Sequence, residues 1–104
     1  MNKIILEKQS QLIELCKKYH AQRLEVFGSV TRNDFDPATS DLDFLVEFDE
    51  VGVGNYADCY FGLLAKLESL FSLPVELVVA SSVKNPYFLQ NIEKNRALLY
   101  AAWN

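Results

Sequence analysis

Two short stretches decide the expected fold: residues 27–33 read Phe-Gly-Ser-Val-Thr-Arg-Asn, and residues 40–46 read Ser-Asp-Leu-Asp-Phe-Leu-Val. An alternating apolar segment over residues 23–27 stops at Gly28, which predicts a strand and then a tight turn. A short helix with Ser29 as its N-cap is expected to follow. Asp41 and Asp43 lie two residues apart on a second predicted strand, residues 41–48, so both carboxylates point to the same face.

The segments around these stretches predict the remaining elements. Residues 3–19 and 56–70 carry apolar residues at helical spacing, and residues 33–40 and 52–55 have the composition of loops. Residues 75–79 and 97–101 are expected to be strands. Asn85 and Pro86 begin a helix that runs to residue 94, where Asn95 closes it in a left-handed conformation. This order predicts a single α/β (α+β) domain, residues 1–104, with a small mixed sheet flanked by helices.

A third carboxylate is expected beside the first two. If the strands over residues 41–48 and 75–79 run parallel, with a right-handed helical crossover, then Glu76 lies at the same sheet edge as Asp41 and Asp43. Three carboxylates next to a glycine turn suit two-metal nucleotidyl transfer, in which Mg²⁺ binds carboxylate and phosphate oxygens. Each feature alone has an ordinary alternative: a Gly-Ser turn, or the solvated face of a half-buried strand.

Composition and charge exclude several other classes. The formal net charge is -4, with ten Lys and Arg against fourteen Asp and Glu and no basic stripe, so nucleic acid is not expected as a direct partner. Two separate cysteines and one histidine do not form a zinc motif. No signal peptide and no apolar run long enough to span a bilayer is present, which predicts a cytoplasmic protein without membrane contact.

The two quoted stretches together resemble the signature of minimal nucleotidyltransferases (MNT) of the DNA polymerase β superfamily. The resemblance implies that Gly28 and Ser29 bind the triphosphate of ATP. It also implies that Asp41, Asp43 and Glu76 are catalytic and hold Mg²⁺, in two ions. Arg32 matches the family pattern too, and either steadies the triphosphate or pairs with Asp34 or Asp36. The sequence departs from the pattern in having eleven rather than ten residues between the motifs, and Glu rather than Asp as the third carboxylate.

The same resemblance implies a biological role. MNT proteins of this size are similar to antitoxins that silence HEPN-domain RNase toxins by adding AMP to a toxin tyrosine. A HEPN-type partner, and protein adenylylation with ATP as the donor, are therefore expected. Two alternatives stay open: a binding module that neutralises its partner by stoichiometric complex formation, and a free-standing transferase for small hydroxylated acceptors. Neither the oligomeric state nor a role for Trp103 follows from the sequence.

Overall fold

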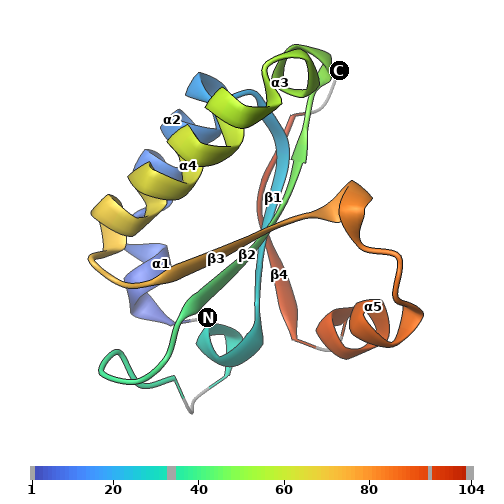
Figure 1. Ribbon diagram of the computed structural model, residues 1–104. Coiled ribbons are helices and arrows are strands. Elements are labelled where there is room, and N and C mark those ends of the chain that lie inside the picture. Colours follow the sequence, from blue (N-terminus) through green and yellow to red (C-terminus); the bar gives the residue numbers. More distant parts are fainter. Residues whose placement is uncertain (1, 33–34, 94, 103–104) are drawn as a thin grey trace.

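A four-stranded mixed sheet forms the centre of the protein. The computed structural model describes residues 2–32, 35–93 and 95–102. The strands are β1 (Ala21–Phe27), β2 (Leu42–Phe48), β3 (Val75–Val79) and β4 (Arg96–Ala101), in the spatial order β3-β2-β1-β4 (Figure 1). β1 runs antiparallel to β2 and β4, whereas β2 and β3 are parallel. The predicted α/β fold and its strand directions are confirmed.

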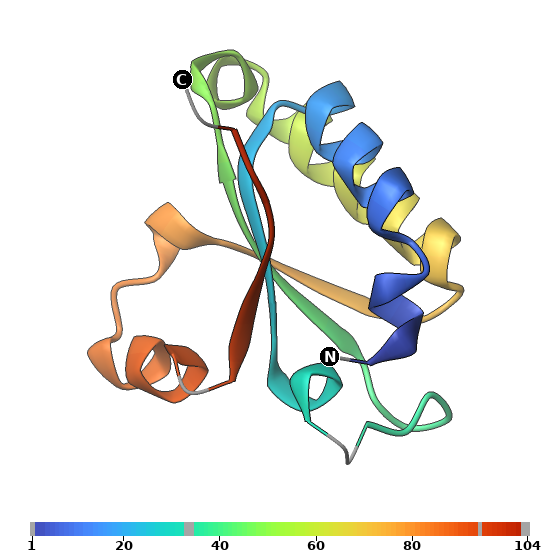
Figure 2. The same cartoon turned by 180° about the vertical axis from the view of Figure 1, so that it is seen from behind.

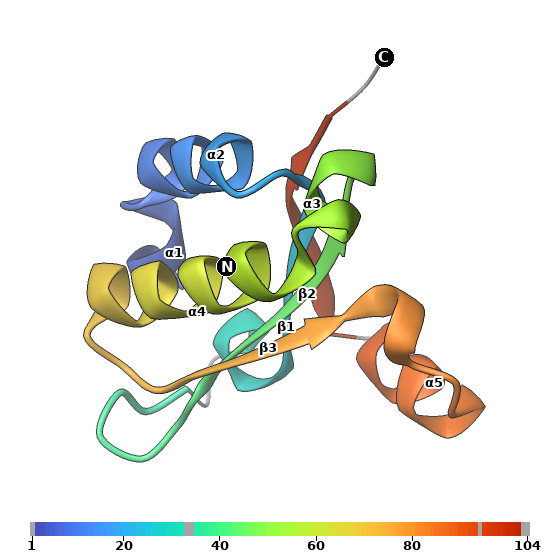
Figure 3. The same ribbon diagram turned by 45° about the horizontal axis from the view of Figure 1, so that its top comes forward.

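Three helices cover one face of the sheet. These are α1 (Lys3–Leu6), α2 (Gln9–Lys18) and α4 (Tyr56–Phe71), and α2 and α4 lie side by side over the strands (Figure 3). Their apolar faces meet those of β1 and β2 in one core, where each buried leucine or phenylalanine contributes roughly 1.5–3 kcal/mol. Residues buried in this core include Leu12, Cys16, Leu24, Val26, Phe44, Val46, Leu63 and Leu67.

The opposite face of the sheet is only partly covered. Because side chains alternate along a strand, this open face carries every second residue: Arg23, Glu25 and Phe27 of β1, Asp43, Leu45 and Glu47 of β2, and Glu76 and Val78 of β3. Helix α5 (Pro86–Glu93) lies on this side, away from the other helices (Figure 2). Its Phe88 contacts Phe27 edge to face, with ring centroids 6.0 Å apart. The rest of the open face is available for a functional site.

The helix expected over residues 3–19 is wrong in one respect, because two helices occupy that range. Lys8, at φ -112° and ψ 13°, separates α1 from α2, and its N–H closes α1 on the carbonyl of Ile5. The Asn2 side chain caps the start of α1 through the Ile4 N–H. No glycine or proline marks the break. Burial of Ile5 on one side and Leu12 on the other accounts for it, through packing rather than local propensity.

The loop expected over residues 52–55 is also wrong. A short helix, α3 (Glu50–Gly54), occupies most of it. The Val53 N–H donates to the carbonyl of Asp49, and the Asn55 side chain donates to the carbonyl of Val51, which closes one helical turn. Two glycines disfavour a helix by about 1 kcal/mol each, but these bonds and packing between α3 and α4 offset that cost.

The loop before β2 and the start of α5 agree with expectation. The Asp36 side chain accepts from the Ala38 N–H, as in a turn, and residues 33 and 34 lie outside the described residues. Asn85 caps α5 by accepting from the Tyr87 N–H at 2.9 Å. The left-handed closure expected at Asn95 depends on a backbone dihedral that involves residue 94, which lies outside the described residues, so it stays a prediction. Residue 94 and Trp103 lie outside the described residues, within which no helix is long and apolar enough to cross a membrane.

Candidate functional site

A tight turn follows β1 where the sequence predicts one. Gly28 adopts φ +79°, which disfavours any residue with a side chain. A Cβ atom at Gly28 would lie 2.7 Å from Oδ2 of Asp43, so glycine also permits the backbone to approach that carboxylate. Residues Gly28–Thr31 form a 3₁₀ turn, η1, whose N-cap is Phe27, so Ser29 is the second residue inside the turn. The N-cap role expected for Ser29 is therefore wrong, whereas the glycine turn is confirmed.

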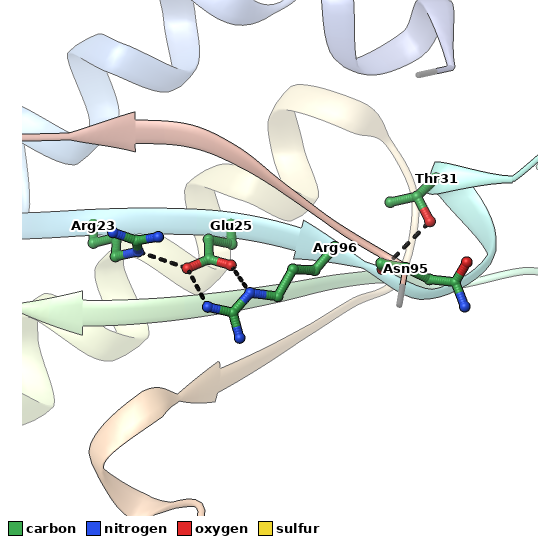
Figure 4. A network of polar contacts seen from close by, with 5 residues as sticks. All are labelled: Arg23, Glu25, Thr31, Asn95 and Arg96. Carbon is green, nitrogen blue, oxygen red and sulfur yellow. Dashed lines mark hydrogen bonds and ion pairs between the residues drawn. The ribbon is translucent and has the colours of Figure 1, made fainter. Parts of the chain in front are cut away.

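The start of β4 anchors this turn. The Gly28 N–H donates to the carbonyl of Asn95 at 3.1 Å, and the Thr31 hydroxyl donates to the carbonyl of Gly28 at 2.7 Å. The Thr31 hydroxyl also lies 3.4 Å from the Asn95 carbonyl (Figure 4). Because the Gly28 amide is already engaged, the amide that the first turn of η1 leaves for a phosphate is that of Ser29.

Two of the three predicted carboxylates lie on adjacent strands in one row. Asp43 pairs with Phe27 of β1 and, on its other side, with Glu76 of β3. Asp41 is one residue before β2 and is exposed. The parallel pairing of β2 and β3 thus brings Glu76 beside Asp43, and the antiparallel pairing of β1 brings Gly28 against the same carboxylate. The convergence expected from the sequence is present in the geometry.

The surroundings of Asp43 disfavour the ionised form of its carboxyl group. Burial raises the pKa of Asp43 to about 6, and the neighbouring carboxylate of Glu76, through its charge and a hydrogen bond, and the charge of Asp41 add to the effect. The charges acting on Asp43 are thus negative ones. A half-buried carboxylate next to two others is a place where a cation would be strongly attracted.

The donor set suits a hard cation, although it is not a closed cage. Among the residues that the structure describes, no three His, Cys, Asp or Glu side chains are grouped so as to hold a metal ion. Oxygen donors on Asp43 and Glu76, with the exposed Asp41 close enough to affect Asp43, are nonetheless the kind that Mg²⁺ takes together with substrate phosphates. The metal-binding role of these residues stays a prediction.

Arg32 follows η1 and is exposed, with its backbone N–H donating to the carbonyl of Ser29 at 3.0 Å. Both roles expected for its guanidinium stay predictions.

A buried ionic network on the open face was not expected. Glu25 is buried and accepts from Nε of Arg23 at 2.6 Å on one oxygen, while Nε of Arg96 lies 2.5 Å from the other (Figure 4). The alternation of Arg23 and Glu25 with Leu24 and Val26 could have indicated that the two charged side chains share one face of the strand. Arg96 could not be predicted as a partner of Glu25, because the two residues lie 71 positions apart along the chain.

Comparison with known proteins agrees with this geometry. A model of the nucleotidyltransferase domain family matches residues 9–99. Two relatives from Methanocaldococcus jannaschii, "Putative protein adenylyltransferase MJ1379" and "Putative protein adenylyltransferase MJ0128", are 33% and 36% identical to this chain, and each alignment covers 89% of both chains. A solved structure described as "putative minimal nucleotidyltransferase" is 28% identical with a TM-score of 0.75, over 93% of this chain and 95% of that one.

A more distant neighbour shares the fold alone. A chain from the solved complex of a tri-AMPylated Shewanella oneidensis HEPN toxin with its MNT antitoxin is 19% identical, with a TM-score of 0.63 over 94% of this chain and 73% of that one. The family model spans most of the sequence and includes both the glycine turn and the carboxylate row. The chain therefore belongs to the nucleotidyltransferase domain family, and it is a nucleotidyltransferase.

Proposed function

We propose that this protein transfers AMP from Mg-ATP to a hydroxyl group of a partner protein. The observation that carries the proposal is the contact of the Gly28 turn with Asp43, which in turn lies beside Glu76. Nucleotidyl transfer needs a phosphate seat directly against metal-binding carboxylates. The relatives named "Putative protein adenylyltransferase" support AMP as the transferred group and a protein as the acceptor.

Different residues would bind the triphosphate and the metal ions. The amide and hydroxyl of Ser29 hold the triphosphate at the Gly28 turn, and Arg32 steadies it. Two Mg²⁺ ions, held by Asp41, Asp43 and Glu76, would supply charge neutralisation and lower the pKa of the attacking hydroxyl.

The transfer itself is a substitution at phosphorus. The acceptor oxygen forms a bond to the α-phosphorus, the bond from that phosphorus to the bridging oxygen breaks, and pyrophosphate leaves. Glu76 is placed to take the proton of the acceptor hydroxyl, since it is exposed on the row next to Asp43. The open face beside this row receives the acceptor.

The acceptor that fits the fold neighbours is a tyrosine of a HEPN-type toxin, so the protein would act as an antitoxin. The solved toxin–antitoxin complexes of MNT proteins that share this fold support that assignment. A protein that neutralises its partner by stoichiometric binding would not need the carboxylates, whereas an enzyme would.

A labelling experiment tests the proposal. Purified protein, Mg²⁺ and ATP labelled on the α-phosphate are added to a lysate of the native host, and labelled proteins are identified by mass spectrometry. We expect one labelled protein, with AMP on a tyrosine, when the protein is intact, and no label with Asp41→Asn/Asp43→Asn. ATP labelled on the γ-phosphate should label nothing through this protein.

Asp58→Asn is the matched control, because it makes the same chemical change on exposed helix α4, and it should label normally. Neutralisation of the partner that survives Asp41→Asn/Asp43→Asn, with no label from any nucleotide, would show a stoichiometric binder instead.

A further inference from the structure

The pairing between β1 and β4 changes register halfway along the two strands. Leu24 of β1 faces Tyr100 of β4, but the next residue, Glu25, faces Leu98. Leu99 is therefore the extra residue of a β-bulge, and it packs against the core as Tyr100 does. A bulge re-aims the residues that follow it, so this one decides which residues of β4 meet the end of β1.

The bulge also determines which carbonyl anchors the glycine turn. In the observed register the Gly28 N–H donates to the carbonyl of Asn95 at 3.1 Å, and the Thr31 hydroxyl lies 3.4 Å from the same oxygen. If the pairing before the bulge continued unchanged, Gly28 would face Arg96 instead, one residue further along the chain. The turn that contacts Asp43 would then lose its anchor on Asn95.

Hydrophobic patterning alone does not select the observed register. Leu98 and Leu99 are adjacent and identical, and a shift by one residue would exchange the faces on which they lie, because side chains alternate along a strand. In the observed register Leu98 is 49% exposed on the open face, although it is as apolar as Leu99. A strand whose apolar residues fit either face is weakly specified in register, so another interaction has to select the pairing.

The ion pair between Glu25 and Arg96 provides that selection. Glu25 has 5% of its side chain exposed; Nε of Arg96 lies 2.5 Å from one of its oxygens, and Nη2 lies 3.3 Å from the other. Arg96 is the diagonal neighbour of Glu25 on the open face, two residues before Leu98. A shift by one residue would turn Arg96 to the helix-covered face and leave this buried carboxylate with Arg23 alone.

We propose that Glu25 and Arg96 are positioning residues for nucleotide binding. Their ion pair holds β4 in the register that brings the Asn95 carbonyl to the Gly28 N–H, and the anchored turn is thereby set for the triphosphate. This role rests on the proposed function of the turn. Figure 4 shows both parts of the connection: the Arg96 side chain reaches toward Glu25, while Asn95, its neighbour in the chain, faces Thr31.

Arg23 offers a matched control. Its Nε lies 2.6 Å from an oxygen of the same carboxylate, and 36% of its side chain is exposed, against 31% for Arg96. Arg23 lies on β1 itself, two residues before Glu25, so its contact does not join β4 to β1. Arg23→Gln and Arg96→Gln therefore remove the same kind of group from Glu25, but only the second frees the start of β4.

Hydrogen exchange of backbone amides in the nucleotide-free protein tests the positioning itself. The Gly28 amide is compared with that of Val46, which is fully buried at the centre of the sheet and reports global opening. We expect Arg96→Gln to speed Gly28 exchange at least about 10-fold relative to Val46, and Arg23→Gln to leave the ratio unchanged. Arg96→Lys keeps the charge but loses the two-nitrogen contact, so it should give an intermediate ratio, and it replaces Arg96→Gln if that variant does not fold.

Calorimetric titration with Mg-ATP, without any acceptor, connects the register to the nucleotide. The Kd should rise about 5-fold in Arg96→Gln, the loss expected for one oriented hydrogen bond, and stay within about 2-fold of wild type in Arg23→Gln. Equal effects of the two variants, on the exchange ratio or on Kd, would show an ion network that serves stability alone and would overturn the proposal. Faster Gly28 exchange with an unchanged Kd would overturn it as well. Failure of wild type to bind Mg-ATP would instead refute the proposed function, while the exchange ratio would still show whether the ion pair sets the turn.

Discussion

Replacement of Asp43 by asparagine should stabilise the metal-free protein at neutral pH. The carboxyl of Asp43 has a pKa of about 6 against an ordinary value of 3.8, a rise of about two units. At about 1.4 kcal/mol per unit, the ionised carboxylate would cost at most about 3 kcal/mol. Because the group is only half-buried, screening reduces this to about 1 kcal/mol. Asparagine fits the same space and removes the charge, so it should recover that amount.

The difference in stability between wild type and Asp43→Asn should depend on pH. A carboxyl whose pKa is higher in the folded than in the unfolded state binds its proton more tightly when folded. The stability of wild type relative to Asp43→Asn therefore falls as pH rises from about 4 to about 6. Urea unfolding in EDTA should give equal stabilities near pH 4. Near pH 7.5 the variant should lead by about 1 kcal/mol, a Tm rise of about 4 °C.

Asp58→Asn is the control, because Asp58 is exposed in the first turn of α4, where a negative charge is favourable. The same chemical change there should cost a few tenths of a kcal/mol. Asp43→Asn must also lose AMP transfer, so that stability and activity move in opposite directions. A variant that is less stable than wild type near pH 7.5, or whose advantage is the same near pH 4, would refute the electrostatic account of this row.

Three further predictions follow from the turn and the core. Gly28→Ala should cost at least about 2 kcal/mol in urea unfolding and abolish transfer, because it combines φ +79° with a Cβ 2.7 Å from the Asp43 carboxylate. Thr31→Val should cost about 1 kcal/mol and raise KM for ATP severalfold with a smaller change in kcat, since it removes the hydroxyl donor to the Gly28 carbonyl. Cys16, whose pKa burial raises to about 12, should not react with a disulfide reagent near pH 8 until the protein is unfolded in urea, and rapid reaction of the native protein would contradict its burial.

Features set by short-range patterns could be predicted from the sequence. The strand before Gly28, the alternation through Asp43 and the Asn85 cap depend on neighbours a few residues apart, and the structure confirms all three. The position of Glu76 beside Asp43 was expected only on the condition that the two strands run parallel through a helical crossover, and the structure meets that condition.

Features set by distant partners could not be predicted. Ser29 is a residue type that favours the N-cap position, but the conformation of the turn depends on the carbonyl of Asn95, more than sixty residues away along the chain. The carbonyl of Asn95 accepts the Gly28 N–H, a contact that no local pattern indicates. The two glycines of α3 favour a loop, but hydrogen bonds between residues four apart close a helical turn there. At Ser29 the tertiary contact outweighs a local capping preference of about 1 kcal/mol.

The open face treats two acidic residues in opposite ways, and the contrast indicates which one is functional. Glu25 is nearly fully buried, yet it has two guanidinium partners that satisfy it. Asp43 is less buried, but the charges that act on it are the like charges of Glu76 and Asp41. The same sheet thus places two guanidiniums beside the buried Glu25 and like charges beside Asp43, in the row that we propose as the site of transfer. An uncompensated carboxylate lowers stability without a cation, and the same energy becomes affinity when Mg²⁺ and the nucleotide bind. The instability predicted for Asp43 is therefore the expected consequence of the role in transfer that we propose for it.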